Sequence, residues 1–197
     1  IESTVKLVAD PRTPHSRKDR MAQQTLALDL YDMINDLSFL SDNLIQVRDQ
    51  AQEKMDGADE ALADALDTYG ESLETLRTSL SSSKGGMITG EEQLRERLGT
   101  LYGNVTSYAG RPSETQFDRR KTLGSELDDA LTSGEDLLVA QLPEVNAMLE
   151  GAGLEPLTTL DRTSWNEDEG IANFSAAVGK YFWRVQLPQS LDSFRIW

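Results

Sequence analysis

Apolar residues recur at steps of three and four along most of the chain, and this spacing is the strongest constraint on its fold. The first run covers residues 16–55 and would form one helix of about 55–60 Å, at about 1.5 Å per residue. Such spacing places the apolar side chains on one stripe of the helix, which must be buried against another element. This stripe consists of Leu26, Leu30, Ile34, Leu37, Leu40, Leu44 and Val47.

Three further helical runs follow, separated by short breaks in the pattern. Asp56-Gly57 ends the first run, and the serine- and glycine-rich residues 81–86 form a loop after the second. Capping-box patterns, in which two side chains satisfy free backbone N–H groups, predict helix starts at Thr89-x-x-Glu92 and Ser113-x-x-Gln116. The stripes are Leu62, Leu66, Tyr69, Leu73, Leu76 and Leu80, then Leu94, Leu98, Leu101, Tyr102 and Val105, then Phe117, Leu123, Leu127, Leu131, Leu138 and Leu142.

Pro143 should kink or interrupt the fourth helix, and Gly151 and Gly153 should end it. Four apolar stripes joined by short breaks can be buried economically against one another. The sequence therefore predicts an all-α fold with an up-down four-helix bundle over residues 16–157. A long coiled coil is the alternative, but the spacing shows no sustained heptad repeat.

The N-terminal residues 1–15 have a different pattern. Residues 4–8 alternate and include β-branched side chains, which predicts a short strand that Asp10-Pro11 ends. A single strand needs a sheet, so it would belong to a domain lying before Ile1. Because the chain begins at Ile1 and not at Met, we expect a processed product or a fragment.

Residues 158–197 form an aromatic-rich C-terminal extension. It contains all three tryptophans and seven of the thirteen aromatic residues of the chain. Such an extension packs on its own domain or docks on a neighbour, and packing on its own bundle is favoured because monomers rarely expose large apolar patches. The candidate partner-binding residues are Trp165, Phe174, Tyr181, Phe182, Trp183, Phe194 and Trp197.

The sequence contains no recognisable catalytic apparatus. The absence of cysteine excludes thiol catalysis, disulfides and zinc–thiolate sites, and the single histidine, His15, lies in a linker without a nucleophile pattern. The phosphate-binding, dinucleotide-binding and serine-hydrolase motifs are missing. We therefore expect no enzyme activity, no catalytic residue and no cofactor. The net charge of −15 opposes binding to nucleic acid, and no apolar run has the length of a membrane helix.

The second helix is strongly acidic. Between Lys54 and Arg77 there is no lysine or arginine. An acidic bundle that binds divalent metal is one interpretation, but no Glu-x-x-His motif is present, so a solvated acidic face is favoured and no metal ligand is assigned. The carboxylates concerned are Asp56, Asp59, Glu60, Asp64, Asp67, Glu71 and Glu74.

Several short motifs follow one another in a recognisable order over residues 5–157. They are Val8-Ala9-Asp10-Pro11-Arg12, the first helix up to Val47-Arg48, residues 94–102 with the later stretch 111–116, and residues 142–149 leading into 153–157. This order resembles the C-terminal helical region of secreted, sortilin-like BNR-repeat (Asp-box) propeller proteins of bacteria, often labelled glycosyl hydrolases. The resemblance implies that any hydrolase activity lies in propellers upstream. It assigns no catalytic residue to this chain, which lacks an Asp-box, and it ends before residues 160–197.

Three functions are therefore compatible with the sequence. The first is a non-catalytic protein-interaction or accessory subunit, exported from a bacterial cytoplasm to the periplasm or beyond, that binds protein partners in a larger assembly, including one seated in a membrane. The second is the C-terminal helical fragment of a secreted propeller hydrolase. The third is an acidic bundle that binds divalent metal. The lack of any catalytic site, together with the aromatic extension, favours the first.

Overall fold

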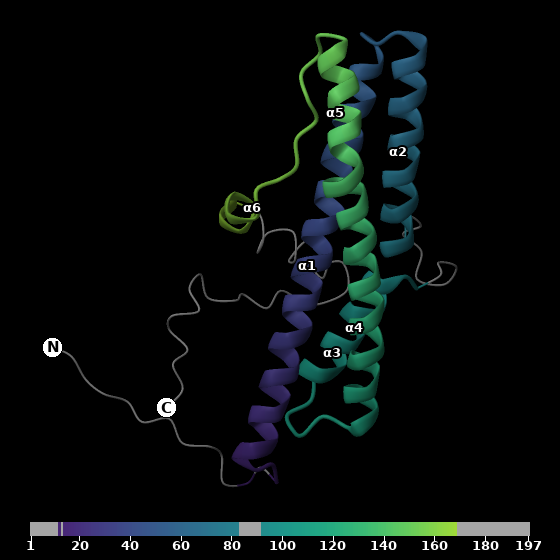
Figure 1. Ribbon diagram of the computed structural model, residues 1–197. Helices are drawn as coiled ribbons and strands as arrows, with labels where there is room; N and C mark the ends of the chain where they lie inside the picture. Colours follow the sequence, from purple (N-terminus) through teal and green to yellow (C-terminus); the bar gives the residue numbers. More distant parts are fainter. Residues whose placement is uncertain (1–11, 13, 83–91, 169–197) are drawn as a thin grey trace, which may run out of the picture.

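The computed structural model describes residues 12, 14–82 and 92–168, and these ranges are helical with no strand (Figure 1). The prediction of an all-α fold is confirmed. The strand predicted at residues 4–8 lies outside the described residues. The helices are α1 (Arg17–Met55), α2 (Glu60–Leu80), α3 (Leu94–Thr106), α4 (Glu114–Glu135), the π-helix η1 (Asp136–Gln141), α5 (Leu142–Gly151) and α6 (Arg162–Asp168).

α1 is one helix of 39 residues, as its leucine spacing predicts. Ser16 caps its start, because the Ser16 hydroxyl accepts a hydrogen bond from the Asp19 N–H at 3.1 Å. The Asp19 carboxylate in turn accepts one from the Ser16 N–H at 2.9 Å. The helix ends at Met55, just before the predicted break at Asp56-Gly57.

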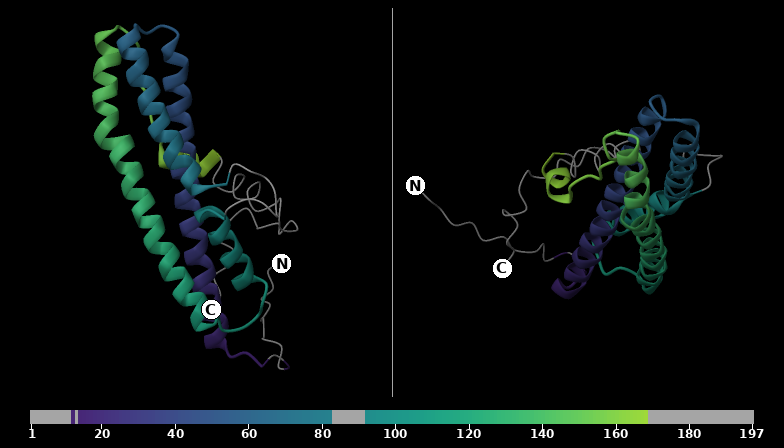
Figure 2. Two further views of the ribbon diagram at one scale, coloured as in Figure 1. Left: turned by 90° about the vertical axis from the view of Figure 1, so that its right-hand side faces the viewer. Right: turned by 45° about the horizontal axis from the view of Figure 1, so that its top comes forward.

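The other helices lie along α1 as two further columns (Figures 1 and 2). α2 packs beside the C-terminal half of α1 and α3 beside its N-terminal half, both antiparallel to it. The third column is the continuous helix of α4, η1 and α5, which returns parallel to α1. The predicted four helical runs are therefore present, but α2 and α3 lie one beyond the other and form a single column. Each is too short to cover the 39 residues of α1 by itself.

The two predicted capping boxes have different outcomes. Ser113 and Gln116 form theirs, with hydrogen bonds of 2.8 Å and 3.3 Å between side chains and backbone N–H groups. The prediction from Thr89-x-x-Glu92 is wrong, because α3 begins at Leu94. The Glu96 carboxylate caps that start instead, accepting hydrogen bonds from the N–H groups of Gln93 and of Ser82. It thereby joins the end of α2 to the start of α3.

The helix passes through Pro143 without a break, because the preceding turn is widened. A proline has no N–H to donate and its ring crowds the carbonyl four residues earlier. In η1 the hydrogen bonds reach one residue further, so that the Leu142 N–H bonds the Leu137 carbonyl. The buried positions follow the same change: they advance by three or four up to Leu137 and then by five to Leu142. The predicted interruption at Pro143 is thus a π-helical turn within a continuous helix.

The core is one continuous cluster of leucines between the three columns. All seven residues of the predicted α1 stripe are buried in it, together with the stripes of α2, α3 and α4 apart from partly buried Leu76, Tyr102, Phe117, Leu131 and Leu138. Tyr69 of α2 is the polar member of the cluster, and its hydroxyl donates a hydrogen bond of 2.9 Å to the Leu137 carbonyl. Burial raises the pKa of Tyr69 to about 12, so the phenol remains a donor at any ordinary pH.

Replacing Tyr69 by phenylalanine should therefore lower the free energy of unfolding by about 1 kcal/mol. The cost stays small because the Leu137 carbonyl keeps its hydrogen bond from Leu142. Urea denaturation measures the change, and Tyr108→Phe, at an exposed tyrosine, is the control that should be neutral. Equal effects from both substitutions would show that the Tyr69 hydroxyl contributes nothing to the packing of α2 on η1.

Candidate functional site

After α5 the chain turns back and runs down the outside of α1 as a segment that we call the strap, residues 152–168 (Figure 1). Gly153 makes the turn with φ of +74°, a conformation that glycine adopts without strain. The Leu154 N–H bonds the Leu149 carbonyl at 2.9 Å and the Gly153 N–H bonds the Glu150 carbonyl at 3.0 Å, which closes the helix end. The predicted termination at Gly151 and Gly153 is confirmed.

Amide side chains hold the extended part of the strap through its backbone. The Asn146 side chain donates to the Leu157 carbonyl at 3.0 Å and accepts from the Leu157 N–H at 2.7 Å. Gln50 binds Thr158 in the same two-sided way, at 2.9 Å and 2.8 Å. An extended segment without a neighbouring strand leaves its backbone groups unpaired, and an amide supplies both a donor and an acceptor. These two side chains therefore do for the strap what a neighbouring strand would do.

The contact continues one and two turns further down α1. Gln46 donates a second hydrogen bond to the Thr158 carbonyl at 3.1 Å. The buried Asn43 accepts one from the Leu160 N–H at 2.7 Å and donates one to the Phe39 carbonyl of its own helix. Its buried amide is thus satisfied by the strap on one side and by α1 on the other.

Trp165 anchors the lower end of the strap. Its side chain is 5% exposed, and its indole N–H donates a hydrogen bond of 2.9 Å to the Asp42 carboxylate. Its ring meets the Phe39 ring edge-on at 5.3 Å between centroids. Arg162 covers both rings, with its guanidinium 4.5 Å from the Phe39 centroid, and it pairs with Asp36 at 2.7 Å. An apolar ring with a polar edge and a stacked cation is a strong local anchor.

The turn that presents Trp165 is fixed by Asp161. Its carboxylate accepts hydrogen bonds from the N–H of Ser164 at 2.9 Å and from the Ser164 hydroxyl at 3.0 Å. These bonds hold the pKa of Asp161 below its usual range. α6 therefore starts at a fixed place, with Trp165 and Arg162 on the side that faces α1.

Of the seven predicted partner-binding residues, the structure describes Trp165, which packs on α1 of its own chain. The other six, Phe174, Tyr181, Phe182, Trp183, Phe194 and Trp197, lie outside the described residues. Residues 158–165 of the extension pack against the bundle and not away from it. That is the arrangement favoured from sequence, up to Trp165.

Sequence reasoning missed the residues that receive the strap. Asn43, Gln46 and Gln50 lie on α1 outside the leucine stripe, where polar residues ordinarily face solvent. A signal was available, because Asp36, Phe39, Asn43, Gln46 and Gln50 recur at steps of three and four and form a second stripe. Nothing in that spacing, however, indicates that the occupant is a segment more than a hundred residues away.

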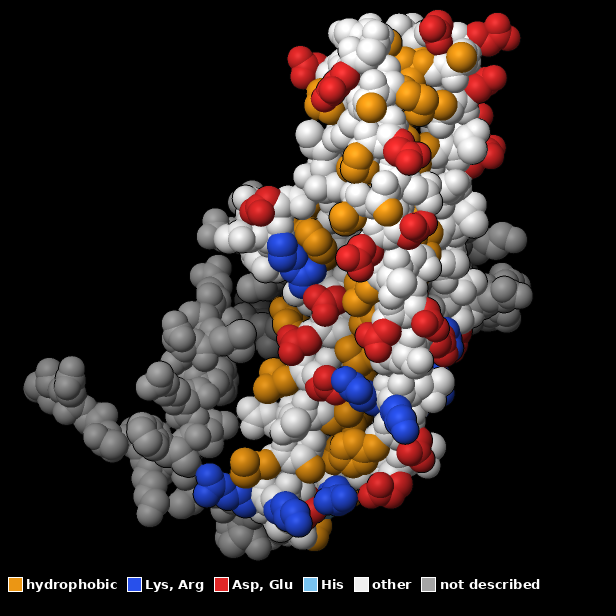
Figure 3. All heavy atoms as spheres, in the orientation of Figure 1, with side chains coloured by type: hydrophobic (Ala, Val, Ile, Leu, Met, Phe, Trp, Pro, Cys, Tyr) orange, Lys and Arg blue, Asp and Glu red, His pale blue; other side chains and the backbone are white. Residues whose placement is uncertain are grey.

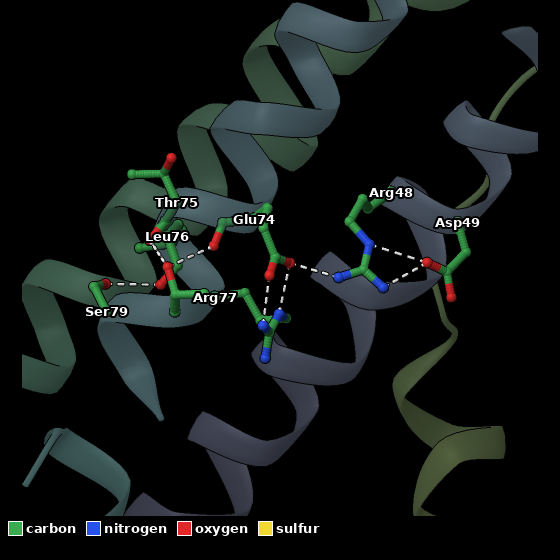
Figure 4. Close-up of polar contacts among 8 residues, drawn as sticks. Arg48, Asp49, Glu74, Thr75, Leu76, Arg77 and Ser79 are labelled. Carbon is green, nitrogen blue, oxygen red and sulfur yellow. Dashed lines mark hydrogen bonds and ion pairs between the residues drawn. The ribbon is translucent and has the colours of Figure 1, made fainter. Parts of the chain in front are cut away.

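One of the acidic side chains of α2, Glu74, forms ion pairs. Glu74 lies between Arg77 of its own helix and Arg48 of α1 (Figure 4), with ion-pair distances of 2.5 Å to each. Within the described ranges, no group of three or more acidic, histidine or cysteine side chains is arranged to hold a metal ion. His15 packs edge-on against Tyr108, 5.4 Å between ring centroids.

Replacing Trp165 by alanine should release the strap from α1. The loss of the buried ring should lower the free energy of unfolding by about 3 kcal/mol, measured by urea denaturation. Amide exchange should accelerate at Leu157 and Leu160 and stay unchanged in α2. Val139→Ala, at an exposed side chain, is the control and should change stability by less than about 0.5 kcal/mol. Undisturbed exchange at Leu160 in the Trp165 variant would contradict the role of Trp165 as the anchor.

Glu74 gives the bundle a dependence on pH. The hydrogen bonds from Arg77 and then from Arg48 lower the pKa of Glu74 from 4.5 to about 2. Because the folded pKa is the lower one, the stabilisation is fully present above about pH 4.5 and is lost as the pH falls toward 2.

The free energy of unfolding of the unmodified chain should therefore fall more between pH 6 and pH 3 than that of Glu74→Gln. The side chain is 38% exposed, so solvent screening limits the difference to about 1 kcal/mol. Glu71→Gln, exposed on the same helix, is the control and should follow the unmodified chain. Parallel pH profiles for the unmodified chain and Glu74→Gln would refute this role.

None of the helices in the part of the chain that the structure describes has both the length and the apolar character needed to cross a membrane. Comparisons of the sequence with models of protein families and with curated proteins, and of the structure with solved structures, give no match. The resemblance to the helical region of BNR-repeat propeller proteins thus stays a prediction.

Proposed function

We propose that this chain is a non-catalytic protein-interaction or accessory subunit of a larger assembly, and that its C-terminal aromatic residues contact the partner. One observation carries the proposal: the strap is fastened to α1 by Asn43, Gln50 and Trp165, so the part of the extension that follows Asp168 begins at a defined point on the bundle. A segment that begins at a fixed point on a rigid helix loses less conformational entropy when it binds than a free tail does.

The chemistry of the extension supports a protein as the partner. Tryptophan, tyrosine and phenylalanine are enriched in the buried centres of protein interfaces and provide much of their binding energy. Phe174, Tyr181, Phe182 and Trp183 occur within ten residues of one another, and Phe194 and Trp197 follow near the end. The net charge of −15 disfavours nucleic acid and anionic lipid as alternative partners.

The same proposal puts the chain outside the bacterial cytoplasm, in the periplasm or beyond, where it joins an assembly that includes a membrane-seated protein. The absence of cysteine is compatible with this compartment, because a cysteine-free chain folds alike in oxidising and reducing surroundings. The described helices contribute no membrane span of their own, so the contact would be made through the partner.

Co-purification from the native source with a tagged full-length chain tests the proposal. We expect a stoichiometric complex, which the double variant Tyr181→Ser/Trp183→Ser should lose because it removes two aromatic contacts from the extension. Val139→Ser, at an exposed apolar side chain of η1, is the control and should keep the complex. A complex that survives the double variant would exclude the extension as the partner-binding element.

A further inference from the structure

The strap covers only the upper part of a longer stripe on α1. Seven positions at alternating steps of three and four make up the stripe: Asp29, Asp32, Asp36, Phe39, Asn43, Gln46 and Gln50. The strap contacts it from Gln50 down to Asp36, where Arg162 pairs with the carboxylate. Asp32 and Asp29 continue the stripe toward the N-terminus of α1, beyond the last strap contact. Asp29 is already bound by Arg120 of α4, whose guanidinium donates two hydrogen bonds to its carboxylate.

Two exposed apolar side chains lie on this same side of α1. Met21 is 54% exposed and Leu28 is 49% exposed, and they are two of the five large apolar side chains exposed in the described ranges. At about 3.6 residues per turn, Met21 lies five turns before Phe39 and Leu28 about three turns before it, so both point the way Phe39 does. Figure 3 shows apolar side chains beside carboxylates along the lower part of α1. We call Met21, Leu28 and Asp32 the lower α1 face.

The next part of the chain has the chemistry to cover this face. Residues 170–197 carry three cations, Lys180, Arg184 and Arg195, against the single carboxylate of Asp192. Their formal side-chain charge is +2, whereas the rest of the chain, with a total of −15, must carry −17. The segment is therefore basic and aromatic, whereas the rest of the chain is strongly acidic and the lower α1 face carries the exposed carboxylate of Asp32 beside two apolar side chains.

The distance also fits. Trp165 is fixed opposite Phe39, and at about 1.5 Å per residue Leu28 lies about 17 Å and Met21 about 27 Å further down α1. The segment from 170 to 197 spans about 42 Å even if it is wholly helical. It can therefore reach the whole of the lower α1 face from the end of α6 at Asp168.

We propose that residues 170–197 of the same chain dock on the lower α1 face, with aromatic side chains on Met21 and Leu28 and a cation beside Asp32. The docking extends the strap contact that the structure already has, down the same side of the same helix. It is a property of the isolated chain and does not depend on the proposed partner. In the assembly, a partner that takes the aromatic residues would displace them from α1.

Because the chain has no cysteine, a single introduced cysteine takes a spin label at one place. A nitroxide on Gln24→Cys, one turn before Leu28 and exposed, should broaden the amide resonances of residues 170–197 in the purified full chain. The control label on Asp64→Cys, exposed on α2, should not. Absence of broadening from Gln24, or equal broadening from both labels, would overturn the proposal.

A mixed sample distinguishes the chain's own segment from that of a second copy. Isotope-enriched chain without label is mixed with labelled chain that is not enriched, and the proposal predicts no broadening of residues 170–197. Broadening in this mixture as strong as in the single chain would mean that the segment docks on a second copy, which would overturn docking within one chain.

A substitution on the lower α1 face gives a second test of the docking. Leu28→Asp should abolish the broadening from the Gln24 label, because it places a charge where an aromatic ring would pack. Val139→Asp, at a side chain that is 64% exposed, should leave the broadening intact. Circular dichroism should be the same for both, since neither side chain is buried in the core. Broadening that persists in Leu28→Asp would refute the docking, whereas loss of the partner complex alone would bear only on the proposed function.

Discussion

Burial of the leucine stripe of α1 is the interaction on which the rest of the structure depends. A single helix of 39 residues cannot bury its own apolar stripe away from water. Two shorter helices together are needed to cover its length. α2 and α3 do this in sequence, and the helix from Glu114 to Gly151 closes the third side. α2 and α3 run antiparallel to α1 as two separate helices, and α4, η1 and α5 return parallel to it as one continuous helix. This arrangement follows from the length of α1 more than from any individual contact.

α1 also has a second face, which works by different chemistry. The leucine side is held by the removal of apolar surface from water, an effect that is non-directional and does not require exact geometry. The strap side is held by amide hydrogen bonds to backbone atoms, which require the strap in one register. Asn43 illustrates the difference, because its buried amide is satisfied only while the Leu160 N–H is in place. One helix thus organises the bundle on one side and selects a peptide segment on the other.

The parts that sequence could predict are those encoded by local periodicity. The extent of α1, the capping box at Ser113 and the helix end at Gly153 each depend on residues within one or two turns. The merging of α2 and α3 into one column could not be predicted, because spacing identifies an apolar stripe without saying which stripe it meets. The strap was missed for a related reason: Gln46 and Gln50 look like solvent-facing residues until Thr158 is known to lie against them. The sequence predicts that Trp165 binds a partner or packs on its own bundle, but only the fold could identify Phe39 and Asp42 as the residues it contacts.

The π-helical turn before Pro143 changes which side of the third column faces the core, because it rotates the upper end of the helix relative to the lower end. One additional residue in a turn rotates everything beyond it by about 100° relative to a regular helix. Below the turn the helix presents Leu123 and Leu127 to the core, and above it the rotated helix presents Val145 and Leu149. The same rotation sets the direction of Asn146, which binds the strap at Leu157. The position of the strap on the outside of the bundle therefore depends, through the winding of one helix, on the π-helical turn that precedes Pro143.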